Sequence, residues 1–274
     1  RHVHLYLNGE YKGLYLLTDQ IEKKKHRVDI ADDGFLFEND NYAWAEPLRF
    51  VTAKKGYQFS FKYPDPEDGE IAEGDDNYYY ILRYMNSFEE ALYGDNFKDP
   101  ATGYRKYIDV ESFAKWYIVA ELTANPDPNM YYVMRRRGAK LKKGPLGDSE
   151  WSLGTSYRGG PTDAWAVPPR KPDPHQVIWG NWKYFGRLFQ DPYFREVVKK
   201  EWVEFKPRIP MVKEKLEDVA ACINEAQAMN FARWPVIGTY LGASLICLGS
   251  WEEEVQYNSD FLDERVRWMD DFLL

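Results

Sequence analysis

Hydrophobic and polar positions alternate at the start of the chain. Val3, Leu5 and Leu7 are separated by polar or aromatic residues, and this period of two predicts a β-strand with one buried face. Asn8-Gly9 then supplies the positive φ angles that a tight turn needs, and residues 13–17 follow as the return strand. The sequence therefore predicts that the chain begins with a β-hairpin.

Further elements are predicted from periodicity and from the residues at their ends. Strands are expected over residues 34–38 and 57–62, the second ending where Pro64 and Pro66 follow. Helices are expected over residues 76–93, from Asp109, from Asp191-Pro192 to Pro207 and from Ser250 onward, and a second hairpin is expected over residues 131–143. The three residues Asp109, Asp191 and Ser250 suit an N-cap, because their side chains can accept hydrogen bonds from first-turn amides.

The order of these elements indicates the fold class. Strands occupy the first part of the chain and helices dominate afterwards, which predicts an α+β fold with N-terminal antiparallel strands followed by a mainly helical C-terminal part. Residues 144–174 hold five glycines and six prolines and are expected to form an irregular loop. No linker of the kind that separates domains is present, so residues 1–274 are expected to form one domain.

Composition narrows the classes of partner. Aromatic residues make up 17% of the chain, which favours a large aromatic core, while an aromatic surface that contacts glycans or proteins stays open. The net charge of -8 argues against nucleic acid as a partner. No apolar run reaches the length of a membrane-spanning helix, so no transmembrane segment is predicted. Cys222 and Cys247 have apolar or small neighbours and are predicted to be buried free thiols, with a disulfide between them left open.

Asp127 is the first candidate for chemistry. It follows the helix that is expected to end near Thr123, in a turn that contains Pro126. A turn between a helix and a strand places a side chain on a rigid corner, where catalytic groups are often found. The alternative is an aspartate that only caps its own turn.

Asp148 and Glu150 are the second candidates. Two carboxylates at positions i and i+2 after a hairpin can bind Mg²⁺ together with phosphate oxygens and water. An acidic residue after a helix, and another after the next hairpin, is the order found in protein kinases, where the first orients the attacking hydroxyl and the second holds Mg²⁺. The paired carboxylates of a glycoside hydrolase stay open as well, because such pairs are set by space and not by sequence.

A basic run lies between these acids. It comprises Arg135, Arg136, Arg137, Lys140, Lys142 and Lys143. Half of these side chains could face a cleft that holds phosphate, and the alternative is a solvated hairpin tip that discourages edge pairing. No glycine-rich phosphate loop of the GxGxxG or Walker type occurs in the sequence.

Several phrases of the sequence match one family in both order and spacing. They are Leu7–Tyr15 (LNGEYKGLY), residues 34–38 (GFLFE), residues 62–66 (KYPDP), residues 107–113 (YIDVESF), residues 121–127 (ELTANPD) and residues 144–148 (GPLGD). On these phrases the chain resembles the CotH kinase-like family, which takes its name from bacterial spore coat protein H. The phrases cover the chain from its start to about residue 150.

The resemblance implies a kinase-like fold of CotH type and, in active members, ATP- and Mg²⁺-dependent phosphorylation of protein substrates. By this likeness Asp127 is expected to be the catalytic aspartate, and Asp148 with Glu150 the ligands of the metal ion. Glu38 and Lys62 fall in family phrases and are expected to line the nucleotide cleft. Family analogy also predicts export to the cell surface or the extracellular space.

The chain departs from the family pattern at one important place. Where the family has the phrase WDFD, this chain has Gly147-Asp148-Ser149-Glu150. A glutamate has a longer arm than an aspartate, and a displacement of about 1 Å can cost roughly a hundredfold in rate. The family also usually carries a short segment before the first hairpin, which is expected to be missing here. The alternative function is therefore a non-catalytic, pseudokinase-type binding module on the cell surface or in a secreted assembly.

Overall fold

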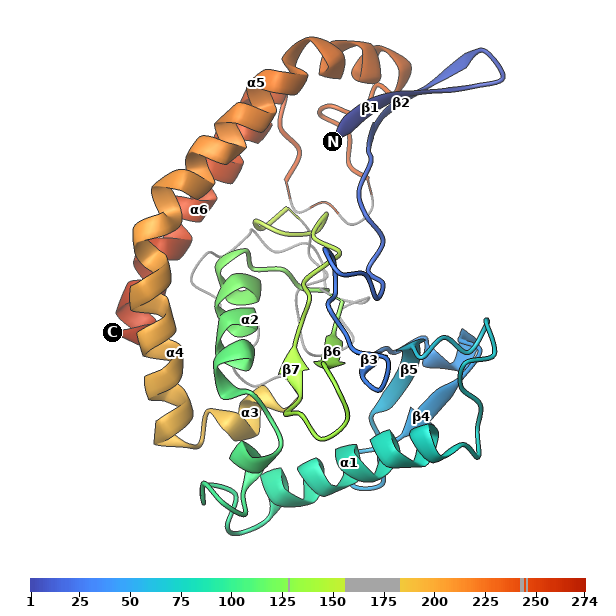
Figure 1. The fold of residues 1–274 in the computed structure, drawn as a ribbon. Coiled ribbons are helices and arrows are strands. Elements are labelled where there is room, and N and C mark those ends of the chain that lie inside the picture. The colour runs from blue at the N-terminus through green and yellow to red at the C-terminus, as the bar shows by residue number, and fades with distance from the viewer. Residues whose placement is uncertain (128, 156–182, 242–243, 245) are drawn as a thin grey trace.

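A five-stranded antiparallel sheet forms the centre of the fold. The computed structural model describes residues 1–127, 129–155, 183–241, 244 and 246–274. The strands are β3 (Phe35–Asn39), β4 (Arg49–Val51), β5 (Gln58–Tyr63), β6 (Tyr131–Met134) and β7 (Lys142–Lys143), in the order β4-β5-β3-β6-β7. All five residues of β3 are buried, because this strand has a neighbour on each side (Figure 1). The predicted strands at 34–38 and 57–62 and the hairpin at 131–143 are confirmed.

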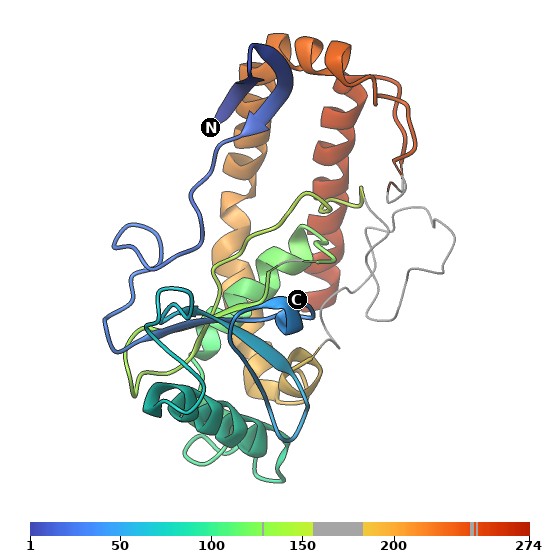
Figure 2. The same cartoon turned by 90° about the vertical axis from the view of Figure 1, so that its right-hand side faces the viewer.

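The N-terminal hairpin is separate from this sheet. β1 (His2–Leu7) pairs with β2 (Glu10–Leu16), and the turn residues Asn8 and Gly9 have φ angles of 51° and 79°. The hairpin lies against the end of helix α5 (Ile209–Arg233), as Figure 2 shows. Gly13 permits this contact, since its φ is +126° and a Cβ there would lie 2.9 Å from Asn230 Oδ1.

The predicted helices are confirmed, and their caps are those that the sequence indicates. The helices are α1 (Asp76–Tyr93), α2 (Val110–Leu122), α3 (Phe185–Leu188), α4 (Pro192–Phe205), α5 and α6 (Trp251–Leu273). Asp109 accepts a hydrogen bond from Ser112 N, Asp191 from Tyr193 N and Ser250 from Glu253 N. A short 3-10 turn, Lys206–Arg208, joins α4 to α5. Pro207 therefore ends α4 as predicted, while a new helix begins almost at once.

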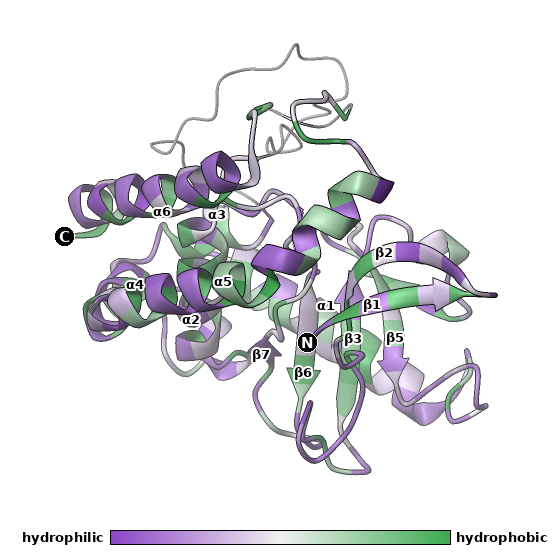
Figure 3. Ribbon diagram, turned by 90° about the horizontal axis from the view of Figure 1, so that it is seen from above, coloured by the Kyte–Doolittle hydropathy of each residue, from purple (hydrophilic) through white to green (hydrophobic). Residues whose placement is uncertain are grey.

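An aromatic core joins the sheet to the helices. Among its fully buried side chains are Phe35, Phe37, Phe59, Tyr104, Tyr117, Tyr132, Tyr184 and Trp202. The rings of Phe37 and Tyr132 stack with centroids 5.7 Å apart. In Figure 3 the ribbon of β3 is largely hydrophobic and that of α6 largely hydrophilic. The high aromatic content is thus used mainly to fill the core, as predicted.

Some predictions are wrong, and others fall outside the described residues. Cys222 and Cys247 are free, as expected, but both are exposed. Cys222 lies on α5, a helix whose described side chains include one buried residue, Ile209. Residues 144–155 contain turns but neither helix nor strand, as predicted, and residues 156–174 of the expected loop lie outside the described residues. No described helix is long and apolar enough to cross a membrane.

Candidate functional site

Glu38 and Lys62 face each other across two neighbouring strands. Glu38, on β3, is 8% exposed, and its Oε1 accepts a hydrogen bond from Asn129 Nδ2 at 2.9 Å. Lys62 Nζ, on β5, lies 3.7 Å from Glu38 Oε2 and 3.0 Å from Glu46 Oε1. Burial raises the pKa of Glu38, while Asn129 and Lys62 act in the opposite direction. The structure therefore brings together the two residues that were expected to line one cleft.

Asp127 lies in a turn that Asn125 organises. The chain leaves α2 through Ala124, which has a φ of 46°, and Asp127 N donates to Asn125 Oδ1 at 3.0 Å. Asn125 is buried, and its Nδ2 donates to the main-chain oxygen of Asp148 at 2.7 Å. One amide side chain thus links the turn that carries Asp127 to the loop that carries Asp148. This residue was not predicted from sequence, although it stands inside the phrase ELTANPD.

Asp148 and Glu150 form a hydrogen-bonded pair of carboxyl groups. This hydrogen bond, then burial and the charges of Glu150, Asp127 and Glu38, raise the pKa of Asp148 to about 7. The same hydrogen bond lowers the pKa of Glu150. Asp148 also has a φ of 57°, a left-handed conformation that aspartate tolerates better than most residues. At neutral pH Asp148 is therefore protonated in about half of the molecules, which reduces the repulsion between the two carboxyl groups.

This pair has the chemistry of a magnesium site. Mg²⁺ is usually held by one or two carboxylates, with phosphate oxygens and water completing its octahedron. Asp148 and Glu150 would supply two carboxylate ligands, and a divalent cation would displace a proton bound to Asp148. No group of three or more His, Cys, Asp or Glu residues that could hold a metal ion occurs in the described part of the chain. The residues therefore fit a metal ion that is shared with a phosphate ligand better than an all-protein cage.

Gly147 explains how the chain tolerates its departure from the WDFD phrase. A Cβ at this position would lie 2.8 Å from Asn129 Oδ1 and 2.9 Å from Ile21 Cδ1. Both Asn129 and Ile21 would have to move if residue 147 carried a side chain. The space that an aromatic residue would need is therefore taken by Asn129, the residue that holds Glu38 in place.

Two lysines that the sequence analysis did not single out interact with these acids through their charge. Lys183 donates to Asn39 Oδ1. Burial lowers its pKa to about 8, although the charges of Asp40, Asp127 and Glu38 act in the opposite direction. Lys183 was missed because no motif in the sequence marks it. It lines a cavity of about 300 Å³, together with Asn39, Asp40, Tyr57 and Gln58 among others.

Lys143 is the second lysine. It is 6% exposed, and its Nζ lies 4.2 Å from the Trp116 ring centroid and 4.3 Å from that of Tyr132. Its Nζ donates to Tyr131 O at 3.2 Å. Burial, and then the charge of Lys183, hold the pKa of Lys143 well below its ordinary value, against the pull of Glu38. Of the basic run, this is the residue that turns inward toward the acids.

The other basic residues of the hairpin lie elsewhere. Arg135, Arg136, Lys140 and Lys142 line a separate pocket, toward the hairpin turn. Arg137 forms an ion pair with Asp76 at the start of α1. The basic run is therefore not one phosphate-binding surface, because strand alternation sends Lys142 and Lys143 to opposite faces.

Comparison with protein families identifies the chain's relatives. The family model described as CotH kinase protein matches residues 1–269. The match includes the helical part of the chain, for which no family phrase was identified from the sequence. A comparison with curated proteins gave no match.

Proposed function

Because the chain belongs to the CotH kinase protein family, we propose that it is a phosphotransferase that uses ATP and Mg²⁺ to phosphorylate protein hydroxyl groups. One observation carries the proposal: the residues that such a reaction needs converge although they come from distant parts of the chain. Asn125 links the Asp127 turn to the Asp148 loop, and Asn129 reaches Glu38. The electrostatic influence of Asp127 and Glu38 extends to both Asp148 and Lys183.

Asp127 is the proposed catalytic residue. Its carboxylate orients the acceptor hydroxyl and takes up its proton as the oxygen attacks the γ-phosphorus of ATP. The bond from the γ-phosphorus to the bridging oxygen breaks, and ADP leaves with the electron pair. Such transfer depends chiefly on positioning and on charge stabilisation, so the hydrogen bonds by which Asn125 fixes the turn also contribute to the rate.

Asp148 and Glu150 are the proposed ligands of Mg²⁺. When bound, the ion neutralises charge on the β- and γ-phosphates. Asp148 and Glu150 would hold the ion as carboxylates, so a proton on Asp148 would be lost when the ion binds.

The lysines are the proposed partners of the nucleotide phosphates. Lys62 forms ion pairs with Glu38, which is buried, and with Glu46, which is half-buried. This arrangement is comparable to the Lys–Glu ion pair of protein kinases. At neutral pH Lys183 is positively charged in most of the molecules, since its pKa is about 8. It also borders a second cavity of about 610 Å³ whose lining includes Tyr57, Tyr93 and Arg187. Aromatic and cationic side chains together suit an anionic aromatic ligand.

A binding module without catalysis is the second candidate, and a specific surface favours it. The β1–β2 hairpin and the residue after it expose several large apolar side chains: Tyr6 (55%), Leu7 (57%), Leu16 (62%) and Leu17 (62%). Exposed apolar patches often mark sites of protein–protein contact. On this reading the acidic site is a remnant and the hairpin binds a partner protein or a glycan.

The test is a thermal shift of the full chain with ATP, with and without Mg²⁺. A ligand at a concentration a hundred times its Kd stabilises a protein by about 2.7 kcal/mol. This raises the melting temperature of a chain of this size by roughly 5–10 °C. We expect a rise that needs Mg²⁺ and that is lost in Asp148→Ala, while Asp33→Ala, at an exposed aspartate, keeps it. No shift at millimolar ATP would reject the phosphotransferase. A Mg²⁺-dependent shift without transfer of the γ-phosphoryl group would favour the binding module.

A further inference from the structure

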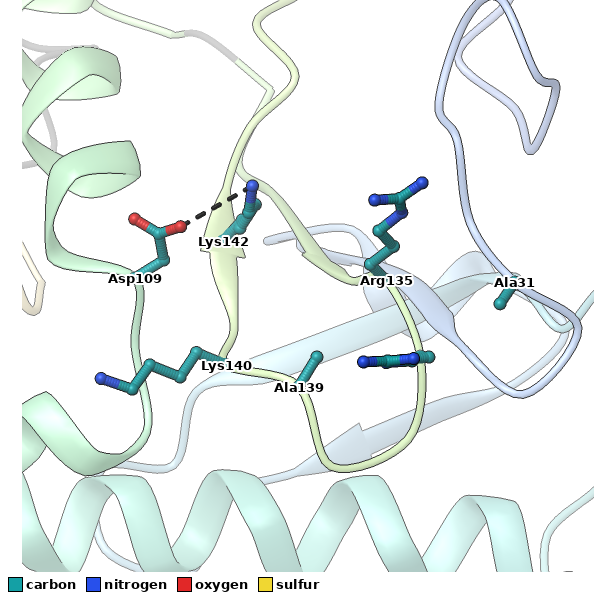
Figure 4. Close-up of a pocket in the computed structure, with 7 residues that line it drawn as sticks. Ala31, Asp109, Arg135, Ala139, Lys140 and Lys142 are labelled. Carbon is teal, nitrogen blue, oxygen red and sulfur yellow. Dashed lines mark ion pairs between the residues drawn. The ribbon is translucent and has the colours of Figure 1, made fainter.

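A second concave site lies at the turn of the β6–β7 hairpin. It is a pocket of about 520 Å³ whose lining includes four cationic residues, Arg135, Arg136, Lys140 and Lys142 (Figure 4). None of the acids of the candidate active site belongs to its described lining. The proposed phosphotransfer therefore leaves this pocket without a role.

Main-chain hydrogen bonds fix the walls of the pocket on both sides. Ala31 N, in the loop before β3, donates to Arg135 O at 2.8 Å. Asp109 N, just before α2, donates to Leu141 O at 2.8 Å, and Leu141 N donates to Tyr107 O at 2.9 Å. These bonds hold both neighbouring segments against the hairpin. The pocket is thus formed before any ligand arrives, which lowers the entropic cost of binding.

The hairpin turn itself is anchored on α1. Arg137 forms an ion pair with Asp76, and its guanidinium lies 4.2 Å from the centroid of the Tyr80 ring. Gly138 N donates to Tyr80 Oη at 2.9 Å. Arg137 therefore holds the turn in place, while its neighbours Arg135 and Arg136 line the pocket.

The charges in the pocket do not balance. Asp109 is the one acid among the described lining residues, and its Oδ2 lies 3.7 Å from Lys142 Nζ (Figure 4). Asp109 Oδ1 accepts a hydrogen bond from Ser112 N and so caps α2. Arg135 pairs with Asp29 at 2.5 Å. Arg136 and Lys140 form no ion pair within the part of the chain that the structure describes, so a local positive excess stands in a chain of net charge -8.

We propose that this pocket is a docking site for neighbouring carboxylates of an acidic polypeptide. Guanidinium groups bind carboxylates through paired hydrogen bonds, and lysine adds a point charge. Ala31 and Ala139 are the uncharged residues of the described lining. Nucleic acid is the poorer ligand, because the negative field of the whole chain opposes a long polyanion while a short acidic segment meets only the local charge.

The docking and its role are separate claims. That the docked polypeptide is the phosphoacceptor rests on the proposed phosphotransferase function. The docking itself does not, because it needs neither ATP nor Asp127. Binding is therefore measured in the absence of nucleotide, so that failure of one claim leaves the other standing.

The experiment uses fluorescence anisotropy with the full chain and labelled peptides of equal length. One peptide is rich in glutamate, one carries a single phosphoserine in a neutral sequence, and one is neutral throughout. We expect the glutamate-rich peptide to bind most tightly, with an affinity that falls as salt rises, and the neutral peptide not to bind. The double variant Arg136→Glu with Lys140→Glu should weaken binding at least tenfold. The control Lys215→Glu with Arg267→Glu makes the same charge change on exposed faces of α5 and α6 and should bind as the original chain does.

Three outcomes would overturn the proposal: equal binding of the neutral peptide, equal loss in both double variants, or tighter binding of a single-stranded DNA of the same length that is lost in the same variant. Binding of the phosphoserine peptide without binding of the glutamate-rich peptide would overturn it as well, because the pocket would then be a phosphate site. Circular dichroism checks that the double variant is folded. Arg136→Ala with Lys140→Ala, which introduces no new charge, should show a smaller loss in the same direction.

Discussion

Arg265 of α6 and Glu121 of α2 form an ion pair at 2.7 Å in which both side chains are fully buried. Arg265 Nε also donates to the main-chain oxygen of Glu121 at 2.7 Å. These contacts join α6 to the last turn of α2, just before the turn that carries Asp127. The last helix of the described chain therefore supports the base of the candidate active site.

Replacing Arg265 should destabilise the whole domain. Arg265→Met leaves a buried carboxylate without its cation, which typically costs about 3–5 kcal/mol. The free energy of unfolding, measured by urea titration with circular dichroism, should fall by that amount. Arg267→Met, on an exposed position of the same helix, should change it by less than about 0.5 kcal/mol. A loss below about 1 kcal/mol for Arg265→Met would contradict the structural role of the pair.

Asn125 should matter for activity beyond its effect on stability. Asn125→Ala removes the amide that joins the Asp127 turn to Asp148 O, and a loss of positioning of about 1 Å costs roughly a hundredfold in rate. We expect kcat for γ-phosphoryl transfer to fall by about that factor. The melting temperature should fall only modestly, since a buried hydrogen bond contributes about 1–3 kcal/mol.

The control for this prediction is Asn96→Ala, an exposed asparagine after α1, which should leave kcat unchanged. Unchanged kcat in Asn125→Ala, with a folded protein, would show that the link between the two acidic segments is dispensable.

Lys183 should make stability depend on pH in the alkaline range. Its amine deprotonates near pH 8 in the folded chain and near its ordinary pKa of 10.5 in the unfolded chain. Between these values the unfolded state binds more protons, so the contribution of this group to stability rises with pH. Lys183→Met removes this contribution.

The measurement is the difference in melting temperature between the original chain and Lys183→Met from pH 7 to pH 9.5. The melting temperature of the original chain should rise relative to that of the variant as pH increases above about 8. Lys25→Met, at an exposed lysine, should show no such trend. A difference that is flat across this range would mean that the pKa of Lys183 is not lowered.

Replacing Gly147 by the aromatic residue that the family phrase has at this position should lower the stability of the protein. In Gly147→Trp the new side chain has to displace Asn129 and Ile21, and overpacking of this kind costs about 1–3 kcal/mol. Gly147→Ala should cost less, because both contacts are with the ends of side chains that can move. The comparison is made by urea unfolding. A Trp variant as stable as the original chain would show that the loop opens freely.

The elements that the sequence predicts well are those fixed by local chemistry. The caps at Asp109, Asp191 and Ser250 lie where their side chains reach first-turn amides. The bounds of α1 match the prediction because apolar spacing and an acidic start agree there. Local patterns failed for Cys222, since an apolar neighbourhood in sequence does not say whether a helix face has a partner in space.

Of the candidate site, the sequence indicated the residues that stand in recognisable phrases. These are Asp127, Asp148, Glu38 and Lys62, and the structure brings Glu38 and Lys62 together. Lys143 could not be separated from its basic neighbours, because the register of β7 against β6 decides which face each side chain takes. Lys183 lies far along the chain from Asn39, with which it pairs, and a contact over such a distance leaves no periodic signal.

The ion pair between α2 and α6 also has a consequence for synthesis on the ribosome. Glu121 precedes Arg265 by 144 residues, so at about 5–20 residues per second their emergence is separated by roughly 7–30 s. During this interval α2 carries a carboxylate whose cation has not yet been translated. A nascent chain, or a fragment cut before α6, therefore lacks the contacts by which Arg265 supports the end of α2, next to the Asp127 turn.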